Sequence, residues 1–370
     1  MDTANKFISF NPGPSQLYPE IEVDIQQALD EHILSLSHRS EKFGEIVRRA
    51  KDNLRTYFSI PADYRIFFAS SAIESMEIAL RNCCSRRSFH FVNGVFSRRF
   101  FTSAQHTKKS PLHLTAEEGQ GFTLEQVKIP SESDLVCLTQ NETSTGVRLS
   151  YEFIEKIRRT HPEKLIAVDI VSSAATERVS FEAADFWFFS VQKACGLPAG
   201  LGVIIVSKRA LTKARVLAAQ GADIGSHHSL LSLDEFSQKQ QTPATPNMLA
   251  IYLLGKRFKR LVQVGIEAVE KGTLEKAKTI YDWLDGHTVL KPFVKNPADR
   301  SFTIIPIVLP EGKTSKAVQE ALKPHNLAVG SGYGSFKETQ IRIANFPQHS
   351  KEDIDRLIKI LNEVLLTPAR

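Results

Sequence analysis

The sequence predicts an α/β protein: a large domain with a mostly parallel, doubly wound sheet, followed by a smaller C-terminal α+β domain. Apolar, strand-like runs alternate with amphipathic helical patterns through the first two thirds of the chain. Runs such as "LIAVDI" are apolar on both faces, as expected of strands that helices cover on both sides. The alternation stops at "QKQQTPATPN", so we expect a large domain over residues 1–254 and a small domain over residues 255–370. The N-terminal segment is expected to pack near the small domain.

The predicted elements follow this alternation in order. Strands are expected at residues 65–69, 89–92, 135–139, 165–168, 186–189 and 203–206, and helices at 73–81, 96–106 and 151–159. After the Gln/Thr/Pro loop we expect a helix with Pro246 near its first position, then one or two helices in "GIEAVEKGTLEKAKTIYDWLDG". The small domain should continue with a strand at 302–309 and end in a helix capped by Ser350.

The composition is that of an ordinary globular protein and argues against several classes of function. The 47 basic and 41 acidic residues give a formal net charge of +6 over 370 residues. No dense basic block is interleaved with aromatic residues, so we expect no nucleic-acid partner; the mild charge suits small anionic metabolites. No signal peptide and no membrane-spanning run is evident, so we expect a cytoplasmic protein with no membrane partner.

The four cysteines indicate a reducing compartment. They form neither a disulfide framework nor a zinc pattern, and we expect no metal site. The adjacent Cys83 and Cys84 cannot act as a CxxC motif.

The stretch "FFSVQKACGLPAGLGVIIV" places a lysine between two apolar strands, where a tight hairpin would suffice. Lys193 follows the carboxyl end of its strand, at the edge where open α/β sheets bind ligands. Burial beside Phe188 and Phe189 would lower the pKa of its amine and suit it to imine formation. The alternative is an ordinary surface lysine in a loop.

Asp169 closes the strand "LIAVD" at the same edge of the sheet. A carboxylate there can pair with a protonated pyridine nitrogen, which keeps an aromatic cofactor an effective electron sink. The alternative is a strand-end aspartate that accepts hydrogen bonds from local amides. Together, Asp169 and Lys193 form the pair that pyridoxal phosphate requires.

A third feature is the turn in "RIFFASSAIESMEIAL", where a strand leads into a helix that opens around Ala72. The first amides of this helix and its dipole would make an anion site. The alternative is Ser71 as an ordinary N-cap, with Glu74 closing a capping box. Neither GxxxxGK[ST] nor GxGxxG occurs, so no loop for ATP or NAD is predicted.

Taken in order, "FNPGPS", "LSHRS", strand–"SSA"–helix, "VNGVFS", "QNETSTGV", "VDIVSS", "SVQK" and "QTPATP" resemble the class V, fold-type I pyridoxal-phosphate enzymes. Within that class they are most similar to the phosphoserine aminotransferase family. The resemblance covers residues 10–345. It implies a seven-stranded sheet, a homodimer with shared active sites, and transamination between O-phospho-L-serine and 2-oxoglutarate by a ping-pong mechanism.

The resemblance also implies roles for single residues around the cofactor. Lys193 would be the Schiff-base lysine and Asp169 the partner of the pyridine nitrogen. Phe96 would stack on the cofactor, where the family usually has tryptophan, and Thr143 would bind the phenolic oxygen. Alternatively, Phe96 is a core residue and Thr143 makes a turn.

The cofactor phosphate and the substrate would be held by further residues of these motifs. The residues implied for the phosphate are Gln192, Ser172, the backbone of Ala72 and Ile73, and Thr242 from the neighbouring subunit. The residues implied for the anionic amino acid and 2-oxo acid substrates are His38, Arg39 and, on the strand "TQIRIANF", Arg342. A His-Arg pair between helices is otherwise a solvated turn.

Two departures leave the amino donor open. Ile73 stands where the commonest relatives carry an arginine. The stretch "GYGSFK", with Gly332, Tyr333 and Gly334, replaces their His-Arg pair. This pattern is closer to alanine–glyoxylate and serine–glyoxylate aminotransferases, which remain an alternative. A lyase or cysteine desulfurase, and a non-enzymatic module on the same fold, are further alternatives.

Overall fold

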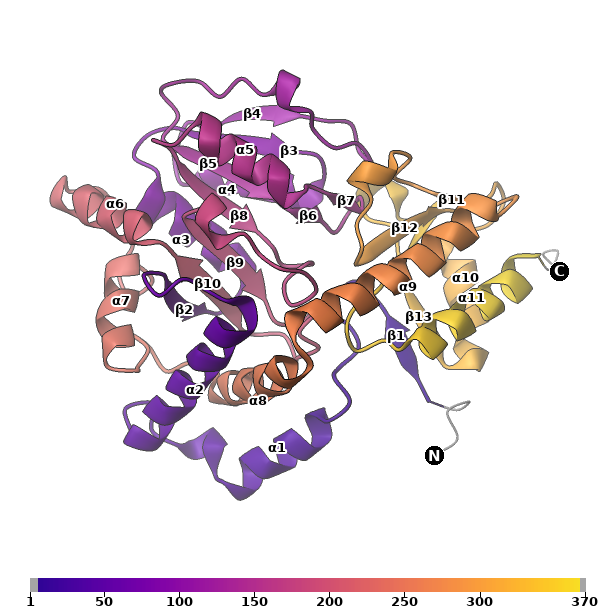
Figure 1. Cartoon of the computed structure of the whole chain (residues 1–370), viewed down its shortest axis with the longest axis horizontal. Coiled ribbons are helices and arrows are strands. Elements are labelled where there is room, and N and C mark those ends of the chain that lie inside the picture. Colours follow the sequence, from indigo (N-terminus) through magenta and orange to yellow (C-terminus); the bar gives the residue numbers. More distant parts are fainter. Residues whose placement is uncertain (1–5, 367–370) are drawn as a thin grey trace.

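The computed structural model describes residues 6–366 and contains two main sheets (Figure 1). The larger sheet has seven strands in the order β2-β10-β9-β8-β5-β3-β4. The strands are β2 (Arg65–Ala69), β3 (Ser88–Val92), β4 (Leu112–Thr115), β5 (Leu135–Thr139), β8 (Leu165–Asp169), β9 (Phe186–Ser190) and β10 (Gly202–Val206). Only β10 runs antiparallel to both of its neighbours. The predicted α/β class with a mostly parallel seven-stranded sheet is confirmed.

Helices cover both faces of this sheet. One face packs against α3 (Ala72–Cys83), α4 (Val95–His106), α6 (Lys208–Ala219) and α7 (Leu230–Gln238). The other face packs against α2 (Glu41–Phe58), α5 (Tyr151–Thr160) and α8 (Met248–Val264), and α1 (Ile21–Asp30) lies outside α8. Because both faces are covered, the central strands are buried at every position.

The smaller sheet has the strand order β1-β13-β14-β12-β11. Its strands are β1 (Ile8–Phe10), β11 (Lys291–Pro292), β12 (Ile304–Val308), β13 (Leu327–Ser331) and β14 (Gln340–Ala344). Helices α9 (Ile266–Gly286), α10 (Ser315–Leu322) and α11 (Lys351–Leu366) pack against it. Strand β1 pairs in parallel with β13, so the first described strand lies in the small sheet, and the chain then crosses to the large one.

The two sheets are connected through α8 and α9, which meet at Gly265 (Figure 1). The buried side chains of α8 belong to the large-sheet core as far as Leu261, whereas those of α9 from Ala277 onward belong to the small-sheet core. The predicted division at residue 255 therefore falls inside a helix. The helices α8 and α9 meet ten residues later at Gly265, where φ is +85°.

Two local expectations differ from the structure. Helix α8 begins at Met248 with Asn247 as its N-cap, so Pro246 precedes the helix rather than opening it. The strand β4 was not predicted, because "LHLT" is a half-exposed edge strand. Within the described residues no helix is both long and apolar enough to span a bilayer.

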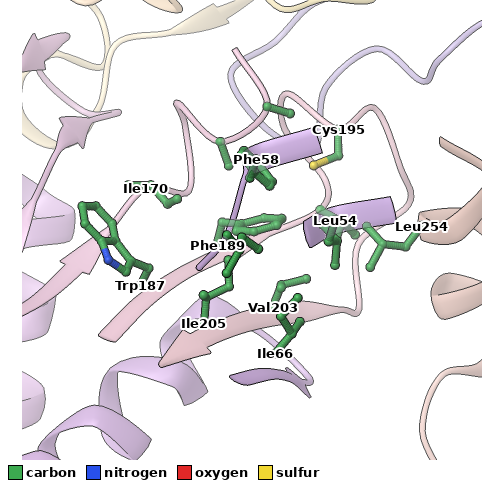
Figure 2. Packing of buried hydrophobic residues seen from close by; sticks show 14 of the residues in the cluster. Leu54, Phe58, Ile66, Ile170, Trp187, Phe189, Cys195, Val203, Ile205 and Leu254 are labelled. Atoms are coloured by element: carbon green, nitrogen blue, oxygen red, sulfur yellow. The ribbon is translucent and has the colours of Figure 1, made fainter. Parts of the chain in front are cut away.

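The core beneath the helices α2 and α8 is rich in aromatic rings. Figure 2 shows Leu54 and Phe58 of α2 facing Phe189 and Val203 of the sheet. The Phe58 ring centroid lies 6.0 Å from that of Phe189 and 5.5 Å from that of Phe258. Aromatic burial of this kind supplies a large share of a domain's apolar stabilisation.

We predict that Phe58→Ala lowers the free energy of unfolding by about 3–5 kcal/mol, because it leaves a cavity between α2 and the sheet. Urea unfolding followed by tryptophan fluorescence measures this, since Trp187 lies in the same core. Val264→Ala is the control, since Val264 is 57% exposed and should change stability by less than about 0.5 kcal/mol. Equal losses in the two variants would contradict this view of the core.

Candidate active site

The carboxyl ends of β8 and β9 place Asp169 and Lys193 at one edge of the large sheet. Asp169 is the last residue of β8, and Lys193 follows β9 by three residues. Between β9 and β10 the chain makes a compact loop, closed by hydrogen bonds from Val191 to Leu201 and from Leu197 to Val191. Gly196 has φ +67°, and a Cβ there would lie 2.9 Å from the Tyr18 amide nitrogen. The glycine-rich loop thus brings the chain close to the N-terminal segment beside Lys193.

Lys193 is buried, with 7% of its surface exposed. Its Nζ donates a hydrogen bond to Thr143 Oγ1 at 2.6 Å and lies 5.0 Å from the centroid of the Phe96 ring. Burial lowers the pKa of Lys193 to about 8, while the charges of Asp169 and Glu142 oppose this shift. An amine with a lowered pKa is partly neutral near physiological pH and can act as a nucleophile.

Asp169 is buried beneath the same site. One oxygen of its carboxylate accepts a hydrogen bond from the Val171 amide at 2.8 Å. Among the described residues, no hydrogen bond is found to the other oxygen. Burial raises the pKa of Asp169 to about 7, although the Val171 amide and the Lys193 charge act in the opposite direction. A buried carboxyl with a free oxygen fits a cationic N–H partner such as a protonated pyridine.

Arg342 enters the site from the small sheet. It lies on β14, between Pro306 of β12 and Gly330 of β13. Its Nη1 donates to the carbonyl of Thr143 at 3.0 Å, and its Nε donates to the carbonyl of Ser331 at 2.8 Å. Burial lowers the pKa of Arg342 to about 10.

Aromatic rings complete this group. The guanidinium of Arg342 lies 5.2 Å from the centroid of the Tyr333 ring, and that ring lies 5.5 Å from Phe96. The structure therefore brings together Lys193, Thr143, Phe96 and Arg342, all of which the sequence nominated. Tyr333 had been noted only as a departure from the family pattern.

The N-terminal segment was expected to pack near the small domain, and it also contacts Lys193 directly. Ser15 Oγ donates to the Lys193 carbonyl at 2.7 Å. Gln348 Nε2 donates to the same carbonyl and to Ser15 Oγ, each at 3.1 Å. Gly13 has φ +152°, and a Cβ there would lie 3.1 Å from Lys193 Cε. The glycine of "NPGP" is the signal in the sequence for this close approach.

The turn before α3, which the sequence predicts to bind phosphate, has the predicted serine N-cap but not the predicted capping box. Ser71 caps α3 by accepting from the Glu74 amide, but the Glu74 carboxylate bonds to Ser70 rather than closing a box on Ser71. The Ala72 amide donates to Ser190 Oγ at 2.7 Å, so a hydroxyl at the end of β9 lies against the predicted anion site. The Ile73 side chain is 42% exposed.

Two other residues nominated for the cofactor phosphate take different environments. Ser172 is fully buried, and its hydroxyl donates to the Asn141 carbonyl at 2.8 Å. Gln192 is half-buried, and its backbone carbonyl accepts from Ser15. Their roles toward a phosphate remain predictions.

His38, Arg39 and Thr242 form a separate group. Arg39 Nη1 donates to Gln241 Oε1 at 2.9 Å and to the Thr242 carbonyl at 2.8 Å, and its Nη2 donates to the Pro243 carbonyl. His38 Nδ1 lies 3.2 Å from Thr245 Oγ1. Within the described residues, no hydrogen bond joins this group to Lys193. In the single chain these side chains hold the "QTPATP" loop.

The cysteines offer no nucleophile to this site. All four are buried and unpaired. Cys195, two residues after Lys193, has its pKa raised to about 12 by burial, which disfavours the reactive thiolate. The cysteine desulfurase alternative is therefore not favoured.

Comparison with known proteins shows similarity to aminotransferases over almost the whole chain. A family model described as aminotransferase class-V matches residues 9–357. A phosphoserine aminotransferase from Rhodococcus jostii is 26% identical over 361 residues, which cover 96% of this chain and 94% of that protein.

Solved structures of aminotransferases also match the chain. The crystal structure of a phosphoserine aminotransferase from Cytophaga hutchinsonii superposes with a TM-score of 0.94 at 41% identity, covering 96% of this chain and 98% of the other. An aspartate aminotransferase from Thermus thermophilus, at 21% identity and a TM-score of 0.83, shares the fold over 97% and 99% of the chains. The chain therefore belongs to the class V aminotransferases and is a pyridoxal-phosphate-dependent transaminase.

Proposed function

We propose that the chain transfers an amino group between O-phospho-L-serine and 2-oxoglutarate, with pyridoxal phosphate held on Lys193. The observation that carries this proposal is the buried Lys193–Thr143–Asp169 group in a chain that is 41% identical to a phosphoserine aminotransferase of known structure. The lower-identity neighbours named as glyoxylate aminotransferases support the fold alone.

The residues around the expected ring position fit the cofactor, and the sequence motifs supply candidates for its phosphate. The carboxyl of Asp169 would face the pyridine nitrogen, Thr143 the phenolic oxygen, and Phe96 a face of the ring. The amides at the start of α3, with Ser172, Gln192 and the partner subunit's Thr242, would hold the phosphate. When bound, pyridoxal phosphate supplies an electron sink for the bond broken at the substrate α-carbon.

The protein's own contribution is to place and move protons. The Lys193 amine would be the base that takes the proton from the α-carbon of the donor in the first half-reaction, and the acid that gives a proton to the α-carbon of the new amino acid in the second. Its lowered pKa matches this task near neutral pH. Asp169 would provide the counter-charge that keeps the ring nitrogen of the cofactor protonated, and burial would strengthen this interaction. Ping-pong kinetics are expected because donor and acceptor use the same site in turn.

The substrate carboxylate would be bound by Arg342. Two of the five N–H groups of its guanidinium are used by backbone carbonyls, and the others have no hydrogen bond among the described residues. A guanidinium in this state suits two-point binding of a carboxylate. The substrate phosphate would be bound by His38 and Arg39 across a homodimer.

A shared site explains why His38 and Arg39 do not contact Lys193 within one chain. We further propose that the enzyme works in the cytoplasm, without a nucleic-acid or membrane partner. Its buried, unpaired cysteines are consistent with a reducing compartment.

Replacement of the lysine tests the assignment of the site. Lys193→Ala should lower turnover by about 10²- to 10⁴-fold or more and remove the visible absorption band of the bound cofactor, because no other amine replaces it. Lys51→Ala is a matched control, since burial also lowers the pKa of Lys51 to about 8 but this residue lies on α2. Near wild-type turnover of Lys193→Ala would refute the assignment.

The raised pKa of Asp169 predicts a pH dependence of stability in the cofactor-free protein. Between its ordinary value of 3.8 and about 7, the folded state binds more protons than the unfolded state, so this residue makes stability fall as pH rises. Asp169→Asn lacks this effect. Its Tm relative to wild type should therefore rise from pH 4 to pH 7 and then level off.

Asp134→Asn is the control for that series. Burial would raise the pKa of Asp134, but hydrogen bonds from Lys213 and Ser85 outweigh it and the pKa is lowered. The Tm difference of this variant should change below pH 4 instead. A flat difference between Asp169→Asn and wild type from pH 4 to 7 would show that Asp169 is not held in the protonated form.

The amino donor is identified by titrating the cofactor-loaded enzyme with phosphoserine, serine and alanine, following the cofactor absorbance. Phosphoserine should act at concentrations about 10²-fold lower or more, because charge-assisted hydrogen bonds to its phosphate contribute about 1.5–3 kcal/mol each. If serine or alanine acts equally well, the activity is that of a different class V aminotransferase. Arg342→Lys should weaken all three donors together.

A further inference from the structure

Glu142 is a fully buried carboxylate for which the reaction described above has no role. It lies in β6 (Asn141–Glu142), which pairs with β7 (Val147–Arg148) beyond the carboxyl end of β5. Burial of a carboxylate is costly unless charges or hydrogen bonds compensate for it. Its partners therefore indicate what it does.

The hydrogen bonds of the Glu142 side chain come from the first turn of α4 and from Ser144. Its two oxygens accept from the amides of Phe96 at 3.3 Å and Ser97 at 2.8 Å, both in the first turn of α4. The same carboxylate accepts from the amide of Ser144 at 3.1 Å and from its hydroxyl at 2.7 Å. Ser144 Oγ in turn accepts from the Val95 amide at 2.9 Å. The negative charge also lies at the positive end of the helix dipole.

The chain leaves room for this side chain at Gly94. A Cβ at that position would lie 2.4 Å from Glu142 Cγ and 2.5 Å from Ser144 Oγ. The φ of Gly94 is 176°, which any residue can adopt, so contact with Glu142 and Ser144 is what demands glycine here. The segments "NGVFS" and "NETS" therefore pack closely against each other at Gly94.

Glu142 connects the two residues that flank the amine. Phe96, whose ring lies 5.0 Å from Lys193 Nζ, is held through its own amide. Thr143, which accepts from Nζ at 2.6 Å, lies between Glu142 and Ser144 in the chain. The charged or titratable groups around the amine are Asp169 on β8, Glu142 on β6, and Arg342 on β14 with Tyr333 against it.

We propose that Glu142 is a positioning residue that fixes the Phe96 ring and the Thr143 hydroxyl around the Lys193 amine and adds a negative charge beside it. This inference rests on the proposed role of Lys193 but not on the identity of the amino donor. The negative charge favours the ammonium form of Lys193 and so opposes the effect of burial.

The test compares wild type with Glu142→Gln, both loaded with pyridoxal phosphate. Glutamine has one acceptor oxygen, so it can accept either from Ser97 or from Phe96 and Ser144, but not from all of them, and its charge is absent. The pH midpoint of the cofactor absorbance should fall by about 0.5 unit or more, because removal of a negative charge disfavours the protonated state. The circular dichroism of the cofactor band should weaken, and kcat should fall by a larger factor than KM rises.

Matched variants separate positioning from helix capping. Glu142→Asp keeps the charge and should restore the pH midpoint without restoring the full dichroism. Glu177→Gln also removes a buried carboxylate, one bound by Arg148 and Gln140, and should lower Tm while leaving the pH midpoint unchanged. Gly94→Ala should displace Glu142 and weaken the dichroism in the same way as Glu142→Gln.

The outcomes are distinct. One outcome is that Glu142→Gln lowers Tm and leaves the pH midpoint, the cofactor dichroism, kcat and KM as in wild type. In that case Glu142 only caps α4, and the proposal is wrong. If Glu142→Gln does not fold, the test uses Gly94→Ala and Glu142→Asp instead. Cofactor dichroism as strong as in wild type in both variants would then refute the proposal. If wild type itself binds no cofactor, the proposed role of Lys193 fails and the fault does not lie with Glu142.

Discussion

Burial of the Lys193 amine is the constraint on which the rest of the site depends. An ammonium removed from water must be compensated, and here its direct hydrogen-bond partner is the Thr143 hydroxyl. The carboxylates of Asp169 and Glu142 provide the opposing charge. A single lysine thus requires the ends of β8 and β9 and the loop after β5 to meet at one point. The sheet, with its aromatic core on one face, holds these ends in register.

The same constraint explains why the small sheet is tied to the large one. Arg342 reaches across to the Thr143 carbonyl, and Gln348 reaches the Lys193 carbonyl. The segment after β1 returns from the small sheet and lies against the lysine at Gly13 and Ser15. Contacts from three parts of the chain therefore converge on residues 143 and 193. Movement of the small sheet relative to the large one would alter the surroundings of the amine directly.

Much of the large sheet could be predicted from the sequence because its signals are local. The strands at 65–69 and 135–139 were predicted to the residue, since each is a short apolar run between polar turns. Strand β1 is different: it has three residues and pairs with β13, more than three hundred positions away. Nothing within such a short segment reports that pairing. The half-exposed β4 carries an equally weak signal.

In the site, too, residues with a local sequence signal could be predicted, and residues defined by distant contacts could not. Lys193 and Asp169 follow apolar strands, and this position alone pointed to the ligand edge of the sheet. Glu142 gave no such signal, because a glutamate in a polar loop is ordinarily solvated. Its partners on α4 are some forty-five residues away in sequence. Only the folded chain shows that this carboxylate is buried among donors.

The charges around Lys193 also bear on the substrate. Within the described residues, two basic groups, Lys193 and Arg342, and two carboxyl groups, Asp169 and Glu142, lie in one cluster, so its charges largely cancel. Tyr333 places an aromatic ring, not a charge, beside Arg342. A substrate with both a carboxylate and a phosphate brings more negative charge than Arg342 can balance. The remaining positive charge must come from outside this cluster. Arg39 donates hydrogen bonds to backbone carbonyls of the "QTPATP" loop. Arg39 from a second subunit would supply that charge.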